Sequence, residues 1–265
     1  MGDINYAPLI DEMVWSYSRI GCYDDCPYRW YLKYIRKCKD KDMFYASYGS
    51  FMHKLIEKFY RGELTKSQML TEYLTRFKDN VKGKRPKAST VKKFIDGGAE
   101  YLRGFSPFPY KMLGVEYKVE FDLDGFKFLG FIDFLGEDDD GGLVIVDNKS
   151  RDLKPRSGRE KPTVKDKELD GMLRQLYLYA IAVEKEFGKL PKGLAFNCYR
   201  TGQFIYEEFN NEAFEEAKAW AIDSIKRIHK DSDFEPNPNV FTCSWICGVN
   251  GNCEYAEIPW NNRKR

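Results

Sequence analysis

The chain has 265 residues, of which 43% are hydrophobic and 16% aromatic, so it can bury the core of one large domain or two small ones. A formal net charge of only +2 does not by itself indicate a nucleic-acid binder, and no run of about 18 apolar residues predicts a membrane span. Residues 1–11 lack the basic and apolar parts of a signal peptide, so we expect a cytoplasmic protein whose seven cysteines are not a disulfide framework.

The N-terminal part, about residues 1–105, has the apolar spacing of helices. A break is expected near Cys26-Pro27, because proline can open a second helix. The expected helices cover 16–37 with that break, 48–60, 66–77 and 90–102.

The pattern then changes to strands, with alternation over 113–123 and 126–135 and a buried apolar run over 143–150. A polar loop is expected over 151–167 and a helix capped by Asp170 that runs to 187. A strand pair (193–199 and 203–209), a helix (211–230) and a tail rich in Pro, Asn and Cys follow. This order predicts one α/β (α+β) domain over 1–265: a helical part, a core over about 110–230 with a mixed central sheet flanked by helices, and a cysteine-containing tail over 231–265.

Asp133 and the triplet Asp147-Asn148-Lys149 carry the most chemical information. A turn-forming segment, 136–142, separates the strands that hold them, which predicts a hairpin that brings two carboxylates and one ammonium together. Adjacent carboxylates repel unless a divalent cation lies between them, and such a cation with a nearby Lys suits phosphodiester hydrolysis. The alternative is that each Asp is an ordinary cap or turn residue.

Two basic stretches could neutralise a phosphate backbone, although either could equally be a solvated loop. The first covers 78–93, where Asp79 is the single acid. The second covers 149–167 and directly follows the predicted catalytic strand, so its basic side chains are candidates for DNA binding: Arg151, Lys154, Arg156 and Arg159.

Cys243, Cys247 and Cys253 form a compact set near the C-terminus. Three close thiolates in a cytosolic chain usually bind metal, and the nearby Gly248 and Gly251 allow tight turns. A fourth ligand is required from elsewhere. The set therefore predicts a metal or cluster site that staples the tail to another segment.

These motifs resemble, in order, those of the PD-(D/E)xK nuclease superfamily. Asp133 and Asp147-Asn148-Lys149 are similar to its catalytic motifs. Gly49 to His53 and Gln175 to Tyr179 resemble the Gly-x-x-x-His and Gln-x-x-x-Tyr motifs of its RecB-like branch. The segments around Ser16 and Cys26, with the C-terminal cysteines, are most similar to the CRISPR-associated and AddB-like iron–sulfur nucleases. The resemblance implies a restriction-endonuclease-like core.

The resemblance also implies roles for these residues. His53, Asp133, Asp147 and the backbone carbonyl of Asn148 would hold one or two Mg²⁺ or Mn²⁺ ions, and Lys149 would orient the attacking water. Gln175 and Tyr179, one helical turn apart, would contact a DNA phosphate or steady Lys149. Glu116 would be an accessory group that coordinates directly or through water. Without the resemblance, His53 could be a half-buried structural histidine, Glu116 an exposed strand carboxylate and Tyr179 a core residue.

The fourth ligand to the three cysteines is Cys26 by the same resemblance, with Cys22 as the reserve choice. A [4Fe–4S] cluster is the first choice, and zinc or a [2Fe–2S] cluster is the rival. The spacing departs from the commoner family pattern, which has two residues between the first two cysteines of the tail. Cys38 and Cys198 are expected to be small buried or half-buried residues.

The predicted function is a metal-dependent DNA nuclease, an exonuclease on single-stranded or end-frayed DNA. Repair, recombination, phage DNA processing and CRISPR spacer processing are all compatible, and protein partners in such a complex are expected. Two other hypotheses stay open: a catalytically silent, metal-stapled subunit that binds nucleic acid, and a structural or redox protein in which the cysteines are the functional groups.

Overall fold

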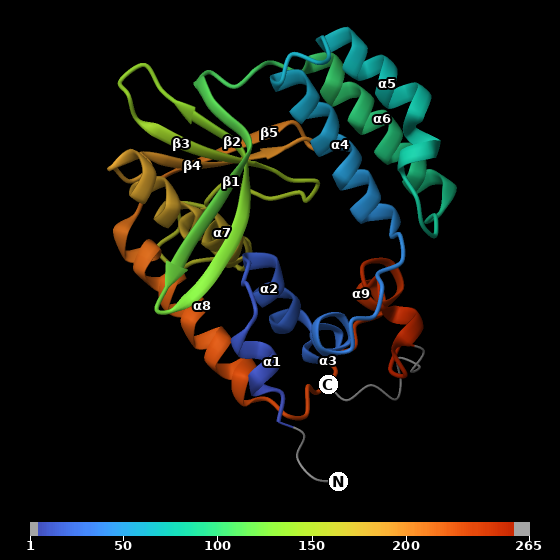
Figure 1. Cartoon of the computed structure of the whole chain (residues 1–265). Coiled ribbons are helices and arrows are strands. Elements are labelled where there is room, and N and C mark those ends of the chain that lie inside the picture. The colour runs from blue at the N-terminus through green and yellow to red at the C-terminus, as the bar shows by residue number, and fades with distance from the viewer. Residues whose placement is uncertain (1–4, 257–265) are drawn as a thin grey trace.

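The computed structural model describes residues 5–256 and places a five-stranded sheet at the centre of the chain (Figure 1). The strands are β1 (Lys111–Leu123), β2 (Phe126–Glu137), β3 (Leu143–Asn148), β4 (Gly193–Cys198) and β5 (Gln203–Glu208), in that spatial order. Only β3 and β4 pair in parallel, and the other neighbours are antiparallel. The predicted mixed sheet is therefore confirmed. The ends of the predicted domain, 1–4 and 257–265, lie outside the described residues.

Helices flank this sheet, as predicted, and α4, α5 and α6 form a group of their own beside it (Figure 1). Their bounds are α1 (Ala7–Asp11), α2 (Tyr17–Asp25), α3 (Pro27–Trp30), α4 (Phe44–Tyr60), α5 (Lys66–Asn80), α6 (Ala88–Gly104), α7 (Val164–Phe187), α8 (Asn211–Lys230) and α9 (Val240–Trp245), with a π-helical turn at Tyr31–Ile35 and a 3₁₀ turn at Asn250–Asn252. Within residues 5–256, none of the helices has the length and apolar character that a membrane crossing requires.

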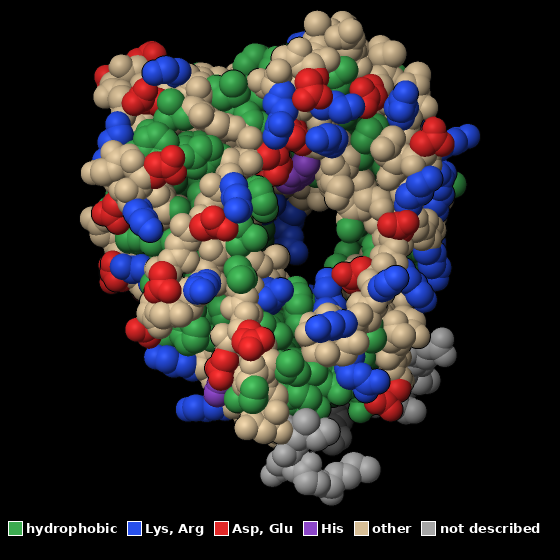
Figure 2. Space-filling model, in the orientation of Figure 1, with side chains coloured by type: hydrophobic (Ala, Val, Ile, Leu, Met, Phe, Trp, Pro, Cys, Tyr) green, Lys and Arg blue, Asp and Glu red, His purple; other side chains and the backbone are tan. Residues whose placement is uncertain are grey.

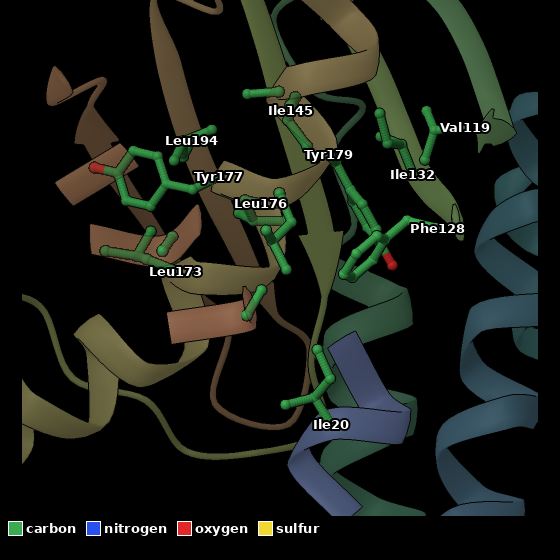
Figure 3. Close-up of a cluster of buried hydrophobic side chains, with 14 of the residues drawn as sticks. Ile20, Val119, Phe128, Ile132, Ile145, Leu173, Leu176, Tyr177, Tyr179 and Leu194 are labelled. Carbon is green, nitrogen blue, oxygen red and sulfur yellow. The ribbon is translucent and has the colours of Figure 1, made fainter. Parts of the chain in front are cut away.

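Strand β3 is buried on both faces, which explains its uninterrupted apolar sequence. Leu143 and Ile145 pack into the large cluster formed with α7 and α8, whereas Val144 and Val146 pack with Phe134 on the other face. Figure 3 shows part of the large cluster, with side chains of α7 and of the sheet packed together. Because side chains alternate along a strand, Asp147 continues the α7 face and Asn148 continues the opposite face.

The start of α7 differs from the prediction. The helix begins at Val164 and not at Asp170, so the expected loop 151–167 ends at residue 163. Thr163 caps it: its Oγ1 accepts a hydrogen bond from the Asp166 N–H at 3.2 Å, and Asp166 Oδ2 accepts one from the Thr163 N–H. Asp166 also accepts hydrogen bonds from the backbone N–H and hydroxyl of Ser157. This reciprocal cap, which ties the loop to the helix, prevails over the cap predicted at Asp170.

Candidate active site

Asp133 and Asp147 lie at the same end of the β2–β3 pair. The antiparallel register runs from Glu137 opposite Leu143 to Phe134 opposite Val146, and its next step would place Asp133 opposite Asp147. Instead of a further ladder bond, the N–H of Asn148 donates to Asp133 Oδ2 at 2.6 Å. The hairpin therefore brings both carboxylates to one end of the sheet, as the sequence predicted.

His53 and Glu116 join Asp133 in a compact group. His53 Nδ1 lies 3.3 Å from Asp133 Oδ2, and one ligand atom from each of the three residues lies within 4.8 Å of the others. Asp147, a predicted ligand, is not in this group, and Glu116, predicted as accessory, is. Glu116 has a φ of +48°, a strained conformation for a non-glycine residue that is retained mostly at functional sites.

Lys149 connects Asp147 to α7. Its ammonium lies 2.8 Å from Asp147 Oδ2 and donates a hydrogen bond to Gln175 Oε1 at 2.9 Å. Gln175 in turn donates to the Tyr179 hydroxyl at 3.1 Å. Tyr179 is 7% exposed and packs against Gly130, where a Cβ would overlap its ring. The structure thus brings Gln175 into contact with the Lys149 ammonium and Tyr179 into contact with Gln175.

Burial and neighbouring charges shift the pKa values of these groups. Burial above all, with the charge of Asp133, raises the pKa of Asp147 to about 6 despite the nearby Lys149. Burial works against charging His53, but its contact with Asp133 and the charge of Asp147 raise the pKa of His53. Burial also opposes ionisation of Asp133, but His53, the Asn148 N–H and Lys149 lower its pKa. The site therefore holds more buried negative charge than its own cations balance.

An opening passes through the middle of the face shown in Figure 2, with a histidine and acidic side chains at its rim and Lys and Arg side chains around it. His53, Glu57 and Glu116 line a hollow of about 400 Å³ beside α4. Substrate-sized groups can therefore approach the carboxylates from solvent.

The comparison with known proteins decides the family, because the model of the PD-(D/E)XK nuclease superfamily matches residues 14–258. The chain belongs to the PD-(D/E)XK nuclease superfamily. Among solved structures, a candidate exonuclease from Eubacterium rectale matches with a TM-score of 0.52 at 17% identity, over 98% of this chain and 92% of that one. This likeness concerns the fold alone. SSO0001 matches with a TM-score of 0.38 at 13% identity, over 92% of this chain and 87% of that one. Among curated proteins no sequence matches.

PD-(D/E)XK nucleases use divalent metals, and the site fits such an ion. Asp147 Oδ2 is buried and forms an ion pair with the Lys149 ammonium at 2.8 Å, with no further hydrogen bond from the described residues. Burial raises the pKa of Asp147 to about 6 despite this ammonium, and a divalent cation would stabilise the charged carboxylate. Asp133, Glu116 and His53 provide hard oxygen ligands and one imidazole, a set that suits Mg²⁺ or Mn²⁺.

Two residues of this nuclease site were not predicted. Glu57 lies one turn after His53 on α4, forms ion pairs with Lys54 and Arg61 at 3.0 Å each, and its charge helps to raise the pKa of Glu116, after the larger effects of burial and of Asp133. The four-residue spacing from His53 is a signal that could have found it. Tyr199, whose ring packs edge-on against His53 at 5.9 Å, has no comparable signal because it follows a distant strand.

The cysteine predictions concern the contact between the N-terminal helices and the tail. Figure 1 shows α9 next to α3, and the Asn237 N–H donates to Cys26 Sγ at 3.4 Å. Burial chiefly, and then the charges of Cys243 and Cys26, raise the pKa of Cys253. Cys22 instead accepts a hydrogen bond from Arg29 Nε at 3.2 Å. The structure therefore places Cys26, and not Cys22, near the cysteines of the tail.

The loop after β3 is less free to bind phosphate than its sequence suggests. Arg156 forms ion pairs with Glu207 at 2.8 Å and Asp170 at 2.9 Å. Arg151 pairs with Glu168 at 3.5 Å and Lys154 with Asp152 at 2.9 Å. Of the four predicted DNA-binding residues, Arg159 alone forms no ion pair within residues 5–256 and is exposed.

Replacing Asp147 with Asn will change how the stability of the metal-free protein depends on pH. The pKa of Asp147 is about 6 in the folded state, against an ordinary value of 3.8. Burying Asp147 therefore costs no stability below pH 3.8, and the folded protein loses stability as pH rises from there through 6. We expect the stability of Asp147→Asn relative to wild type to improve by on the order of 2 kcal/mol between about pH 4 and pH 8. Urea unfolding in EDTA measures it.

The charge of Asp147 helps to raise the pKa of the neighbouring His53, so the stability that His53 loses as pH rises is smaller in Asp147→Asn than in wild type, and this acts in the same direction. Asp140→Asn, on the exposed turn before β3, is the matched control and should show no such trend. A constant difference between Asp147→Asn and wild type across the pH range would contradict the raised pKa.

Proposed function

We propose that the chain is a divalent-metal-dependent deoxyribonuclease that acts on single-stranded or frayed DNA ends. The observation that carries this is the convergence of Asp133 and Asp147, from neighbouring strands, with the Lys149 ammonium at 2.8 Å from Asp147. The intact set argues against a silent binding subunit, because a protein that only binds DNA needs no buried, poorly compensated carboxylates.

Asp133, Glu116 and His53 would hold the ion, with Asp147 and the carbonyl of Asn148 closing the site from β3. When bound, the divalent ion polarises the scissile phosphate and lowers the pKa of a water. Asn148 keeps Asp133 oriented through its N–H, and Gln175 keeps Lys149 pointed at the reaction centre. Lys149 would stabilise the charge that develops on the phosphate, through a preorganised ammonium in a partly buried site.

The preference for single strands is supported by where basic side chains gather. Lys41, Lys54, Lys58, Arg76 and Lys82 line a groove of about 530 Å³ between α4 and α5. Lys54 is paired with Glu57 and Lys58 with Glu72, so Lys41, Arg76 and Lys82 are the three that form no ion pair with described residues. Ser50 and Lys54 belong both to this groove and to the hollow beside His53. A basic groove that leads to the carboxylates suits a strand whose phosphates are followed one by one.

Cleavage of DNA labelled at one end tests the function. Wild type should degrade single-stranded DNA with Mg²⁺ or Mn²⁺ and not with EDTA, and Asp147→Ala should be inactive. Circular single-stranded DNA separates the modes, because an exonuclease leaves it intact. Metal-independent cleavage, or full activity in Asp147→Ala, would refute the proposal. Binding without any cleavage by wild type would support the silent-subunit alternative instead.

Arg159→Ser should weaken binding of single-stranded DNA, whereas Arg156→Ser should not. Arg159 is free of ion pairs among the described residues, so it can release a counterion from the strand, and its loss should lower the salt-dependence slope by about 0.7. Arg156 is held by Glu207 and Asp170, so its loss should affect stability. Fluorescence anisotropy in EDTA at several salt concentrations measures the slope. Equal slopes for the two variants would show that the loop does not track the strand.

A further inference from the structure

A second cavity, of about 640 Å³, lies between the end of α6, residues 105–109 and the β4–β5 hairpin. Its walls are aromatic: the Phe108 and Phe204 rings lie 5.6 Å apart and the Tyr101 and Phe105 rings 5.8 Å apart. Phe204 is 41% exposed, which is unusual for a large apolar side chain that could have packed inside. The cavity therefore offers flat apolar surfaces to a ligand.

Asn197 forms the polar floor of this cavity and is 5% exposed. Its amide nitrogen donates to the Tyr101 hydroxyl and to Asn148 Oδ1, both at 2.7 Å, so both of its N–H groups are used. Within residues 5–256, Asn197 Oδ1 accepts no hydrogen bond and the Tyr101 hydroxyl donates none. The floor thus keeps one acceptor next to one donor, and a ligand that fills the cavity should satisfy both.

Every nucleobase carries a donor next to an acceptor on one edge of a flat ring, which matches this floor between these walls. Arg200 also lines the cavity and donates a hydrogen bond from its Nε–H to the carbonyl of Ser150 at 2.9 Å. Its remaining N–H groups form no hydrogen bond or ion pair with described residues. They are available to a phosphate attached to the base.

We propose that this cavity binds one unpaired nucleobase, with its phosphate on Arg200. The base stacks on Phe204 and reaches Asn197 and Tyr101 with its edge. Asn148, which contacts Asn197 at the floor of the cavity, lies on the face of β3 away from α7. The cavity is therefore on the other side of β3 from the Lys149 ammonium and is a separate site. Base binding goes beyond the proposed cleavage, and it rests on that function only because the base would belong to the DNA strand that is cleaved.

The test is fluorescence of 2-aminopurine, which is quenched when the base stacks, measured in EDTA so that nothing is cleaved. A short single-stranded oligonucleotide with one 2-aminopurine should be quenched by wild type. Phe204→Ala should weaken its binding at least about fivefold and remove most of the quenching. Tyr206→Ala is the matched control, because Tyr206 lies on the same strand, is 39% exposed and does not line the cavity. Tyr101→Phe, which deletes one hydroxyl, should weaken binding without loss of stacking.

A parallel titration with free 2-aminopurine nucleoside monophosphate identifies the source of the base. Affinity equal to that of the oligonucleotide indicates a free nucleotide, and much weaker affinity indicates a strand. Identical behaviour of Phe204→Ala and Tyr206→Ala, or no quenching of either ligand by wild type, overturns the inference. Cleavage of DNA by the same preparations with Mg²⁺ is read separately, so failure of base binding and failure of the nuclease proposal remain distinct.

Discussion

Replacing Lys149 with Met will lower the rate of DNA cleavage by about 100- to 1,000-fold, because it removes the ammonium to which we assign the stabilisation of charge on the phosphate. The ammonium is held between Asp147 Oδ2 at 2.8 Å and Gln175 Oε1 at 2.9 Å. Single-turnover cleavage at saturating Mg²⁺ measures the loss.

The same substitution should strengthen metal binding, and this separates loss of chemistry from loss of the fold. Lys149→Met leaves the buried Asp147 without its ion-pair partner, so the metal-free variant should be less stable than wild type. A divalent cation from solution can replace that partner, so the variant should gain more stability from Mg²⁺ than wild type does. Thermal unfolding against Mg²⁺ concentration measures the gain. Lys165→Met, which removes a surface pair with Glu168, is the control and should leave both quantities unchanged. Retained cleavage, or a weaker response to Mg²⁺, would exclude the assigned role of Lys149.

The parts of the site that could be predicted from the sequence are those set by local pattern. Alternation and a turn-forming segment place Asp133 and Asp147 at one end of a hairpin, and the four-residue spacing places Gln175 and Tyr179 on one helical face. Both follow from the periods of strands and helices, which do not depend on the rest of the chain.

The parts that could not be predicted depend on distant segments or on backbone strain. The family resemblance implies a role for Glu116, but its contact with Asp133 depends on the pairing of β1 with β2, and alternation does not describe its φ of +48°. Arg156 is neutralised by Glu207, on a strand that follows 50 residues later, so a count of local acids overstated the free positive charge of its loop. The Thr163 cap was present in the sequence, but the prolines and basic residues before it are also typical of a longer loop.

Cys26→Ser should bleach and destabilise the protein if the cysteines hold the iron–sulfur cluster that the family resemblance implies. Zinc with a metal–sulfur distance of about 2.3 Å needs thiolates within about 4 Å of one another. Within residues 5–256, the group of ligand atoms that all lie within 4.8 Å of one another is that of His53, Glu116 and Asp133, so the cysteines are not brought together as a zinc site would require. The ligands to be tested are the predicted ones, Cys26, Cys243, Cys247 and Cys253, with zinc as the rival to the cluster.

Anaerobically purified wild type should be brown with broad visible absorbance, and Cys26→Ser should be colourless. A crosslink from Cys26 to the tail closes a loop of about 200 residues, so its loss should cost on the order of 5 kcal/mol and lower the melting temperature by about 10 °C. Cys22→Ala, one turn earlier, should stay brown, because Cys22 is bonded to Arg29 and not turned to the tail. If Cys22→Ala is colourless and Cys26→Ser stays brown, the ligand is Cys22 and not Cys26. A colourless wild type with one bound zinc would reject the cluster. A wild type with neither metal would leave the packing of Tyr28 against Tyr255 and Glu254 as the contact that joins the tail to α3.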